Sequence, residues 1–472
     1  MTDPNILCVS VDSVRADFCN INGENGENTT PFLNSIASEA TVFRNAITPS
    51  TWTLPVHASV FTGLYPPEHG ILTGNETLGD HPTFAQCLSK NGYSTDAFFK
   101  NGWLETGDIL RGFDHSDGTD ESKSDSGIKT QMKRRIADEL ENFPELAEQT
   151  AQILYHAQKQ YREWSGLGSV SSRGGERTIR EYVNHLSEGN EPFCSFVHFN
   201  DAHWRYNPPN PYQNAFSERT SLGNVYNYAW WQYQVYASRT NRLKAAVGDT
   251  SPPDREVETF KNLYRSSIRH TDSLVEELID SLKRQGVWDD TILILFGDHG
   301  DSFGEDGIFG HHFSVHDSII HVPFMIRDPT GQLDTGTVSD PVSLVDIYPT
   351  VLELAGVSGP ETSGINLLRD SRDIAYSYYD VSDHDLYLGA SDRGIDPDRL
   401  PPAKQYVAWA AEGRKVIEYP EEDEYVIVGH GDSTLRARLE EHRDQLDTID
   451  TKEGCITDDV AKRLEGMGYL RE

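Results

Sequence analysis

Apolar runs of strand length alternate with stretches of helical period over most of this chain. That alternation is typical of βαβ units wound around a largely parallel sheet, so the pattern predicts an α/β fold. Thr30 followed by Pro31 predicts an N-cap and the first residue of a helix that extends to Glu39. Six runs are predicted as strands of the sheet: Asn5 to Val11, Thr41 to Ala46, Ser94 to Phe99, Phe193 to Phe199, Thr291 to Phe296 and Val322 to Ile326.

Two regions interrupt the alternation, and the last hundred residues follow a different pattern. A charged, helical insertion is expected at about 122–188 and an aromatic one at about 207–253, both within a large domain of residues 1–370. Residues 371–472 are expected to form a smaller α+β subdomain. Its predicted elements are the strands Asp373 to Tyr378, Tyr406 to Ala410, Lys415 to Tyr419 and Glu424 to Val428, and the helices Thr434 to Glu441 and Asp458 to Met467.

The chain is strongly acidic, with 75 acidic and 41 basic residues among 472 and a formal net charge of -34. This charge argues against nucleic acid as a partner, because phosphate backbones are bound by Lys and Arg. Only 13 of the basic residues are Lys. A Lys-poor, acid-rich composition resembles cytosolic proteins of salt-accumulating halophiles and suggests a halophilic archaeon as the source; an acidic mesophilic protein is the alternative.

Cysteine usage and hydropathy suggest where the protein works. The five cysteines are far apart and show no CxxC spacing, so they are expected to be free thiols in a reducing compartment. No run approaches eighteen consecutive apolar residues, which excludes a membrane span, and no basic n-region with a cleavage site is visible. A cytoplasmic location is therefore expected.

Acids and imidazoles follow three of the predicted strands. Asp12 follows the first strand, Asp201 and His203 follow the fourth, and Asp298 and His299 follow the fifth. Because the carboxyl ends of parallel strands meet at one edge of a sheet, these side chains could share one divalent cation. The alternative for any one of them is an acid that caps the next helix.

A hydroxyl-rich run from Ser50 to Gly70 contains a second candidate group. Residues Pro55 to Thr62 can form a helix, which places Thr53 just before its first turn, where free amides and the helix dipole favour negative charge. Thr53 could therefore be an activated nucleophile. By composition alone it is more often an N-cap.

In their order along the chain these motifs resemble the sulfatases of the alkaline phosphatase superfamily. The resemblance covers roughly Ile6 to Leu368 and implies an alkaline-phosphatase-like sandwich around the central sheet. It rests on Asp12, the Thr53-x-Pro-x-x-Ala-Ser-x-x-Thr-Gly run, Gly92 to Thr95 leading to Lys100, Asp201-x-His203, Gly297 to Gly300, Gly310-His311, Val322-Pro323 and Asp346 to Thr350.

The resemblance implies one divalent metal ion held by Asp12, Asp298 and His299, with the Thr53 oxygen completing the site. Oxygen ligands with one imidazole suit Ca²⁺, Mg²⁺ or Mn²⁺, and Zn²⁺ is an alternative.

Three further residues match family positions that hold the anion or protonate the leaving oxygen: Lys100, His203 and His311. Taken alone, Lys100 is more often a surface lysine and His311 a loop residue.

The chain departs from the sulfatase pattern in three places. Thr53 stands where the family has the Cys or Ser that becomes formylglycine, His57 replaces the motif's Arg, and Ser13 replaces the second Asp of a ligand pair. Threonine nucleophiles are typical of phosphodiesterases and phosphoglycerol transferases in the same superfamily. A second metal, which those enzymes bind, would have Asp201, His203 and His311 as its candidates.

We therefore predict a metal-dependent hydrolase of sulfate esters that attacks through Thr53. A phosphodiesterase, phosphonate monoester hydrolase or phosphoglycerol-type transferase is the first alternative, and a non-catalytic anionic-glycan binding protein the second. The substrate is expected to be a small-molecule or glycan ester. The aromatic insertion from Tyr206 to Tyr236 is either a sugar-stacking wall or core packing.

Overall fold

The computed structural model describes residues 3–21, 27–118, 174–186, 189, 192–217, 222–236, 238–382, 384–429, 433–446, 448–454, 456–457, 460–461 and 464. Most of the predicted helical insertion, most of the predicted helix from Asp458 to Met467, and Cys455 lie outside these residues. Among the helices of the described part, none is long and apolar enough to cross a membrane.

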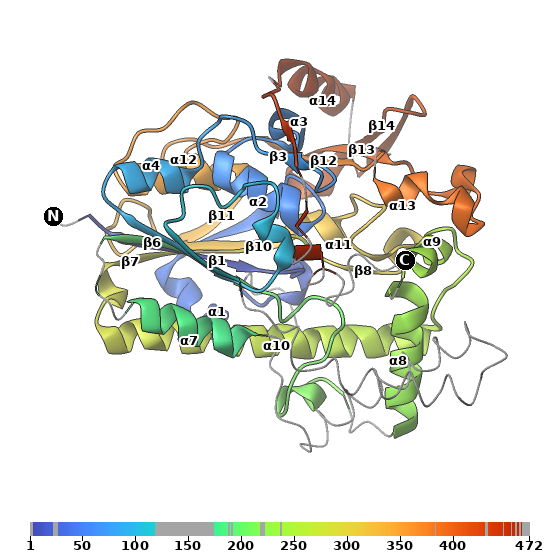
Figure 1. The fold of residues 1–472 in the computed structure, drawn as a ribbon, viewed down its shortest axis with the longest axis horizontal. Helices are drawn as coiled ribbons and strands as arrows, with labels where there is room; N and C mark the ends of the chain where they lie inside the picture. The colour runs from blue at the N-terminus through green and yellow to red at the C-terminus, as the bar shows by residue number, and fades with distance from the viewer. Residues whose placement is uncertain are drawn as a thin grey trace.

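An eight-stranded sheet forms the centre of the molecule (Figure 1). Only β10 runs antiparallel to its neighbours; the other strands are parallel to one another. The predicted α/β class with a mostly parallel sheet is confirmed. In spatial order the strands are β11 (Gly336–Ser343), β2 (Thr41–Ile47), β10 (His321–Arg327), β7 (Thr291–Gly297), β1 (Asn5–Val11), β6 (Phe193–Phe199), β4 (Ser94–Phe99) and β5 (His115–Gly118).

Helices cover both faces of this sheet because its central strands are apolar on both sides. Along β1, Ile6 and Cys8 face one core while Leu7, Val9 and Val11 face the other. The first core lies under α2 (Thr53–Thr62), α4 (Phe84–Lys90) and α12 (Ile347–Leu354). The second lies against α1 (Pro31–Ile36), α7 (Gly175–Leu186) and α10 (Asp254–Gln285), on the opposite side in Figure 1.

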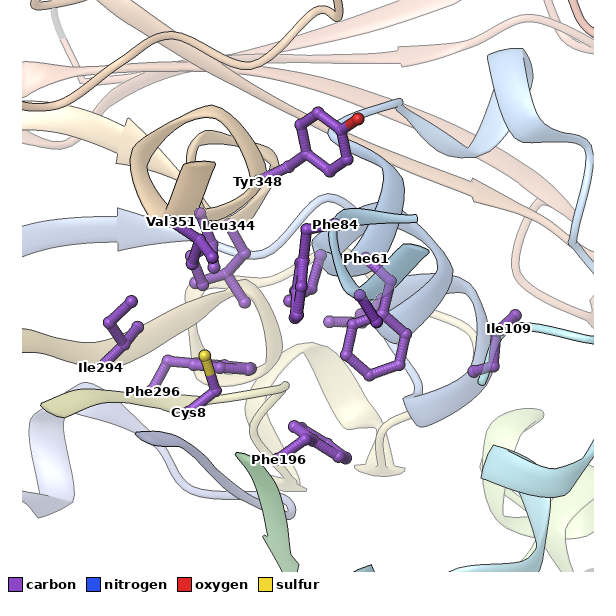
Figure 2. Close-up of a cluster of buried hydrophobic side chains, with 14 of the residues drawn as sticks. Cys8, Phe61, Phe84, Ile109, Phe196, Ile294, Phe296, Leu344, Tyr348 and Val351 are labelled. Atoms are coloured by element: carbon purple, nitrogen blue, oxygen red, sulfur yellow. The ribbon is translucent and has the colours of Figure 1, made fainter. Parts of the chain in front are cut away.

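The first core is rich in aromatic rings that join helices to strands. Figure 2 shows Phe61 of α2 and Phe84 of α4 near Phe196 of β6. The Phe61 ring packs edge-on against Phe84 at 5.5 Å and against Phe196 at 5.0 Å between centroids. These contacts fix α2 on the sheet and with it the position of Thr53.

The cap of α1 differs from the prediction. Thr30 makes no side-chain capping bond to this helix; its hydroxyl accepts a hydrogen bond from Asn20 N. The free amides of Phe32 and Leu33 donate instead to the Asp272 carboxylate on α10, each at 2.9 Å. The helix also ends at Ile36, and a 3₁₀ turn continues from Ala37 to Glu39.

The four strands predicted near the C-terminus are present and pair antiparallel. They are β12 (Ile374–Asp380), β13 (Lys404–Ala410), β14 (Arg414–Tyr419) and β15 (Glu424–Val428), followed by α14 (Ser433–Gln445). Leu435 and Leu439 of α14 pack on this sheet. The sheet shares buried contacts with Ile319 and Ile320 of the larger part of the chain. The boundary at residue 370 stays a prediction.

The remaining elements are short or lie in the predicted aromatic insertion. They are α3 (Pro66–His69), β3 (Glu76–Thr77), α8 (Leu222–Tyr236), α9 (Arg239–Ala246), β8 (Ser302–Phe303), β9 (Phe309–Gly310), α11 (Asp317–Ile320), α13 (Asp385–Leu388) and β16 (Lys452–Glu453).

Candidate active site

The carboxyl ends of four parallel strands place polar side chains at one edge of the sheet. Asp12 follows β1, Asn101 lies just beyond β4, Asn200 follows β6, and Asp298 follows β7. Backbone hydrogen bonds link these ends, because Asp12 N donates to Phe199 O and Asp298 N donates to Val11 O. The side chains therefore meet although their positions in the chain lie far apart.

Thr53 is the first residue of α2, two positions earlier than the helix predicted from Pro55. The preceding Trp52 is extended and provides no side-chain cap, so Thr53 is not the N-cap that composition favoured. Its side chain is buried, and Asn101 Nδ2 lies 3.2 Å from the Thr53 hydroxyl and 2.9 Å from Asp12 Oδ2. The hydroxyl thus lies at a helix N-terminus, where negative charge is stabilised.

Asp12, Asp298 and His299 offer three ligand atoms that all lie within 4.8 Å of one another. His299 Nε2 is 3.6 Å from Asp12 Oδ1 and 3.7 Å from Asp298 Oδ2. Both Asp298 Oδ2 and His299 Nε2 are buried, and among the described residues neither atom has a hydrogen-bond partner. Buried polar atoms are nearly always satisfied, so two such atoms facing one point fit a bound cation.

The electrostatics of the two carboxylates support the same assignment. Burial and the nearby Asp12 charge raise the pKa of Asp298 well above its ordinary value. Burial opposes ionisation of Asp12 as well, but the neighbouring imidazoles of His203, His198 and His299 hold its pKa below the ordinary value. Without a cation, Asp12 is therefore ionised while Asp298 tends to stay protonated, so the two carboxyl groups together have one negative charge. A divalent ion would stabilise both carboxylates in the ionised form.

Ser13 aligns the two carboxylates. Its backbone has a φ of 59°, and its N–H donates to Asp298 Oδ1 at 2.9 Å while its hydroxyl donates to Asp12 Oδ1 at 2.7 Å. Tyr264 OH donates to the Ser13 carbonyl at 2.6 Å. In place of a second Asp, this chain therefore has a residue that orients the ligands.

His57 lies beneath Thr53 on α2. Its Nδ1 donates to the Thr53 carbonyl at 2.8 Å, and its Nε2 lies 2.9 Å from Ser10 Oγ. Burial, together with the neighbouring His198, lowers the pKa of His57 to about 3, so the ring is neutral at neutral pH. The motif's arginine is thus replaced by a neutral ring that braces the start of α2.

His311 and His203 are buried next to the candidate metal group. The His311 ring is 4.4 Å from that of His299 and 5.5 Å from that of His203, between centroids. His311 Nδ1 lies 2.9 Å from Asp301 Oδ1, and Tyr206 OH donates to Asp301 Oδ2 at 2.6 Å. If the Asp301 carboxylate accepts the Nδ1 proton, Nε2 of His311 is left to accept or return a proton.

Lys100 and Asp201, two candidates from the sequence, are not part of the group formed by Asp12, Asp298 and His299. Asn101, which follows Lys100, donates to the Thr53 hydroxyl, and a role for Lys100 stays a prediction. Asp201 joins Glu176 of α7 and His270 of α10 in a separate group. A third group, His57, His198 and Asp298, shares Asp298 with the first. In the described part of the chain no three-residue metal group includes His203 or His311, and a second metal stays a prediction.

The aromatic insertion contributes mainly to the core. Tyr206, Tyr228 and Tyr236 are fully or almost fully buried in the second core. Trp231 packs partly against the same core, and Trp230 is exposed. Other rings line the pocket beside Thr53, those of Trp52, Trp103 and Tyr379.

The sulfatase family model matches residues 4–357. The choline-sulfatase of Rhizobium meliloti is 26% identical over 386 residues, covering 77% of this chain and 71% of that protein. The arylsulfatase of Clostridium perfringens is 25% identical over 81% of both chains. Arylsulfatase K of Bos taurus is 24% identical over 73% of this chain and 61% of its own length.

Solved structures show the same fold. The phosphonate monoester hydrolase of Agrobacterium radiobacter superposes with a TM-score of 0.65 and 18% identity, covering 94% of both chains. A 2-O glycosaminoglycan sulfatase superposes with a TM-score of 0.62 and 18% identity, covering 94% of this chain and 91% of the other.

The fold and the site define a class, the ester hydrolases of the alkaline phosphatase superfamily. Within that class the chain belongs to the sulfatase family.

Proposed function

We propose that this protein hydrolyses sulfate esters, with Thr53 as the nucleophile and one divalent metal ion held by Asp12, Asp298 and His299. The observation that carries the proposal is the buried Thr53 hydroxyl, which lies at the start of α2 and shares the Asn101 amide with Asp12. A non-catalytic glycan-binding protein has no need of a nucleophile beside a metal group. Ca²⁺, Mg²⁺ and Mn²⁺ suit these ligands best.

The side chains suggest how the reaction proceeds. A bound divalent cation lowers the pKa of a coordinated hydroxyl and polarises an ester oxygen. Asn101 orients Thr53 Oγ1 for in-line attack, and the free amides of α2 stabilise the anion. His311, held by Asp301, takes up the proton that Thr53 Oγ1 loses on attack and returns it to the leaving oxygen.

Phosphate or phosphonate esters are the second candidate substrates, and the identity of residue 53 favours them. A threonine cannot form the aldehyde hydrate through which sulfatases release sulfate, whereas water readily resolves a threonine phosphoester. An activity panel separates the candidates: 4-nitrophenyl sulfate, bis(4-nitrophenyl) phosphate and 4-nitrophenyl phenylphosphonate, each with Mn²⁺, Mg²⁺ or Ca²⁺. Turnover of none of them would favour the glycan-binding alternative.

Replacing Thr53 tests the nucleophile. We expect Thr53→Ala to lower kcat by at least roughly 10³-fold on the best ester of the panel, because the attacking oxygen is lost. The metal-induced rise in Tm should remain, since Asp12, Asp298 and His299 still bind the ion. Thr53→Ser keeps the hydroxyl and is the control, with partial activity expected. Full activity of Thr53→Ala would mean that water attacks directly.

The proposed location is the cytoplasm of a salt-accumulating archaeon. Four cysteines, Cys8, Cys19, Cys87 and Cys194, are buried free thiols, which suits a reducing compartment.

A further inference from the structure

Tyr206, the first tyrosine of the aromatic insertion, connects that insertion to the candidate active site. Its side chain is completely buried, and its ring packs against those of Tyr264 and Phe303 at 5.3 and 5.6 Å between centroids. Its hydroxyl donates to Asp301 Oδ2 at 2.6 Å. Burial, and then the nearby Asp301 charge, raises the pKa of Tyr206 well above its ordinary value, so the hydroxyl keeps its proton for this bond.

The Asp301 carboxylate, which lies between β7 and β8, uses its two oxygens for two different partners. Oδ2 accepts from Tyr206, and Oδ1 lies 2.9 Å from His311 Nδ1. The backbone of the same residue is also held, because its carbonyl oxygen accepts from Arg15 Nη1 at 3.1 Å. Asp301 is fully buried, so losing either side-chain bond would cost more than it would in water. The two bonds together therefore fix the direction in which the carboxylate faces His311.

His311 is part of the wall of the pocket that also contains Thr53. With Tyr206 donating to one carboxylate oxygen of Asp301, the other oxygen is an acceptor for the Nδ1–H of His311. A buried carboxylate bound to one ring nitrogen of a histidine holds the ring in one tautomer and one orientation, which leaves Nε2 for proton exchange. Tyr206 is thus linked to the pocket through two successive hydrogen bonds.

We propose that Tyr206 and Asp301 are positioning residues for His311: Tyr206 orients the Asp301 carboxylate, and Asp301 holds the His311 ring with Nε2 toward the leaving oxygen. This inference rests on the proposed function, in which His311 exchanges a proton with the reacting groups. As the bond between sulfur or phosphorus and the leaving oxygen breaks, that oxygen keeps the electron pair and takes the proton from His311 Nε2. The aromatic insertion then serves the proton transfer through one hydroxyl.

The dependence of the rate on the leaving group tests this proposal. Tyr206→Phe keeps the ring and removes only the hydroxyl. The substrates are the phenyl and 4-nitrophenyl esters of the anion that the protein hydrolyses. We expect kcat to fall at least about tenfold more on the phenyl ester, because phenoxide is the more basic leaving group and depends more on the proton from His311. KM should change little, and a change in packing alone would lower kcat by the same factor on both esters.

Tyr228→Phe is the matched control. Tyr228 lies in the same insertion and is equally buried, and its hydroxyl donates to the Tyr206 carbonyl at 2.6 Å. This variant loosens the insertion without removing the bond to Asp301, so the ratio of the two kcat values should stay unchanged. Circular dichroism checks that each variant folds. Asp301→Asn should show at least the same leaving-group dependence, and it replaces Tyr206→Phe if the latter does not fold.

The low-field proton NMR signal of the His311 Nδ1–H group reports the bond to Asp301 without turnover. Its absence from His311→Gln assigns the signal. We expect Tyr206→Phe to broaden it through faster exchange with water, because the carboxylate is then free to turn, and Tyr228→Phe to leave it unchanged.

The two measurements separate the inference from the proposed function. Equal losses on the two esters in Tyr206→Phe, or the same leaving-group dependence in Tyr228→Phe, would overturn the inference and preserve the proposed function. An unchanged NMR signal in Tyr206→Phe would also overturn the inference. A signal broadened in Tyr206→Phe alone, with no ester hydrolysed by the unmodified protein, would preserve the positioning of His311 and overturn the proposed function.

Discussion

His69, at the end of α3, is a buried histidine that the fold holds neutral. Ile71 N donates to its Nδ1 at 3.0 Å, so the ring proton is on Nε2, 3.0 Å from Ser59 Oγ. Burial lowers the pKa of His69 to about 3. Protonation would remove the acceptor of the Ile71 amide and bury a charge.

Because the pKa of His69 is low in the folded chain, we expect the folded protein to lose stability in acid. The unfolded chain binds the proton near pH 6.5 and the folded chain only near pH 3, so stability should fall as pH decreases between these values. At pH 5 the contribution of His69 is a loss of about 2 kcal/mol. Urea unfolding at pH 7.5 and pH 5 should show a smaller loss for His69→Gln. The control is His321→Gln, at a partly exposed histidine, which should lose as much unfolding free energy between pH 7.5 and pH 5 as the unmodified protein. If His69→Gln also loses as much as the unmodified protein, His69 is not the cause of the acid sensitivity.

Single residues also show how far the sequence predicts the site. Asp12, Asp298 and His299 lie together as predicted, because acids and imidazoles that follow buried strands are recognisable in the sequence; their role as metal ligands stays a prediction. Asn101 and His198 were missed, although His198 Nε2 lies 3.3 Å from Asp12 Oδ2. Asn101 follows a strand and His198 lies within one, and residues of these types are common at such positions. Only the order of the strands in the sheet shows that both lie beside Asp12.

The helix α2, which begins at Thr53, ends at Gly63, and the local structure requires glycine at this position. Gly63 has a φ of 72°, and its N–H donates to Ser59 O at 2.8 Å to close the last turn. A Cβ at this position would lie 2.7 Å from Thr362 Oγ1. Both the backbone conformation and the neighbouring side chain therefore require glycine.

We expect Gly63→Ala to destabilise the protein by about 2 to 4 kcal/mol, from left-handed backbone strain and overpacking together. Gly286→Ala is the matched control, because Gly286 ends α10 with a φ of 79° and a Cβ there would meet nothing within 4 Å. It should lose only about 1 kcal/mol. Urea titrations give the free energy of unfolding of each variant. If Gly63→Ala and Gly286→Ala lose the same free energy, contact with Thr362 does not contribute to the cost.

Most strands of the central sheet were predictable, but their arrangement was not. β1, β4 and β6 have the predicted bounds because turn residues or a helical stretch mark the ends of each strand. β11 was missed, since its sequence contains Gly, Asp and Pro and five of its eight residues are not buried. The reversed direction of β10 depends on a crossover that no local pattern records.

At the scale of the whole molecule, the net charge of -34 predicts a dependence on salt. The screening length is about 30 Å at 0.01 M salt and about 3 Å at 1 M, so repulsion across the surface falls steeply over this range. We expect Tm and activity to rise from low millimolar to molar KCl. An unchanged melting curve between roughly 0.05 and 2 M KCl would refute the halophile interpretation and leave the active site unaffected.

The strand order of the central sheet has a consequence for how the protein is made. β1 pairs with β6 on one side and with β7 on the other, so β1 is synthesised well before its two partners, which end at Phe199 and Gly297. At 5 to 20 residues per second, a ribosome takes roughly 15 to 60 s to extend the chain from β1 to the end of β7. During that time an apolar strand has unpaired edges, and long-range pairing of this kind is slow to form. The edge of the sheet that carries Asp12 and Asp298 is therefore completed only after β7 has been synthesised, about 290 residues after β1.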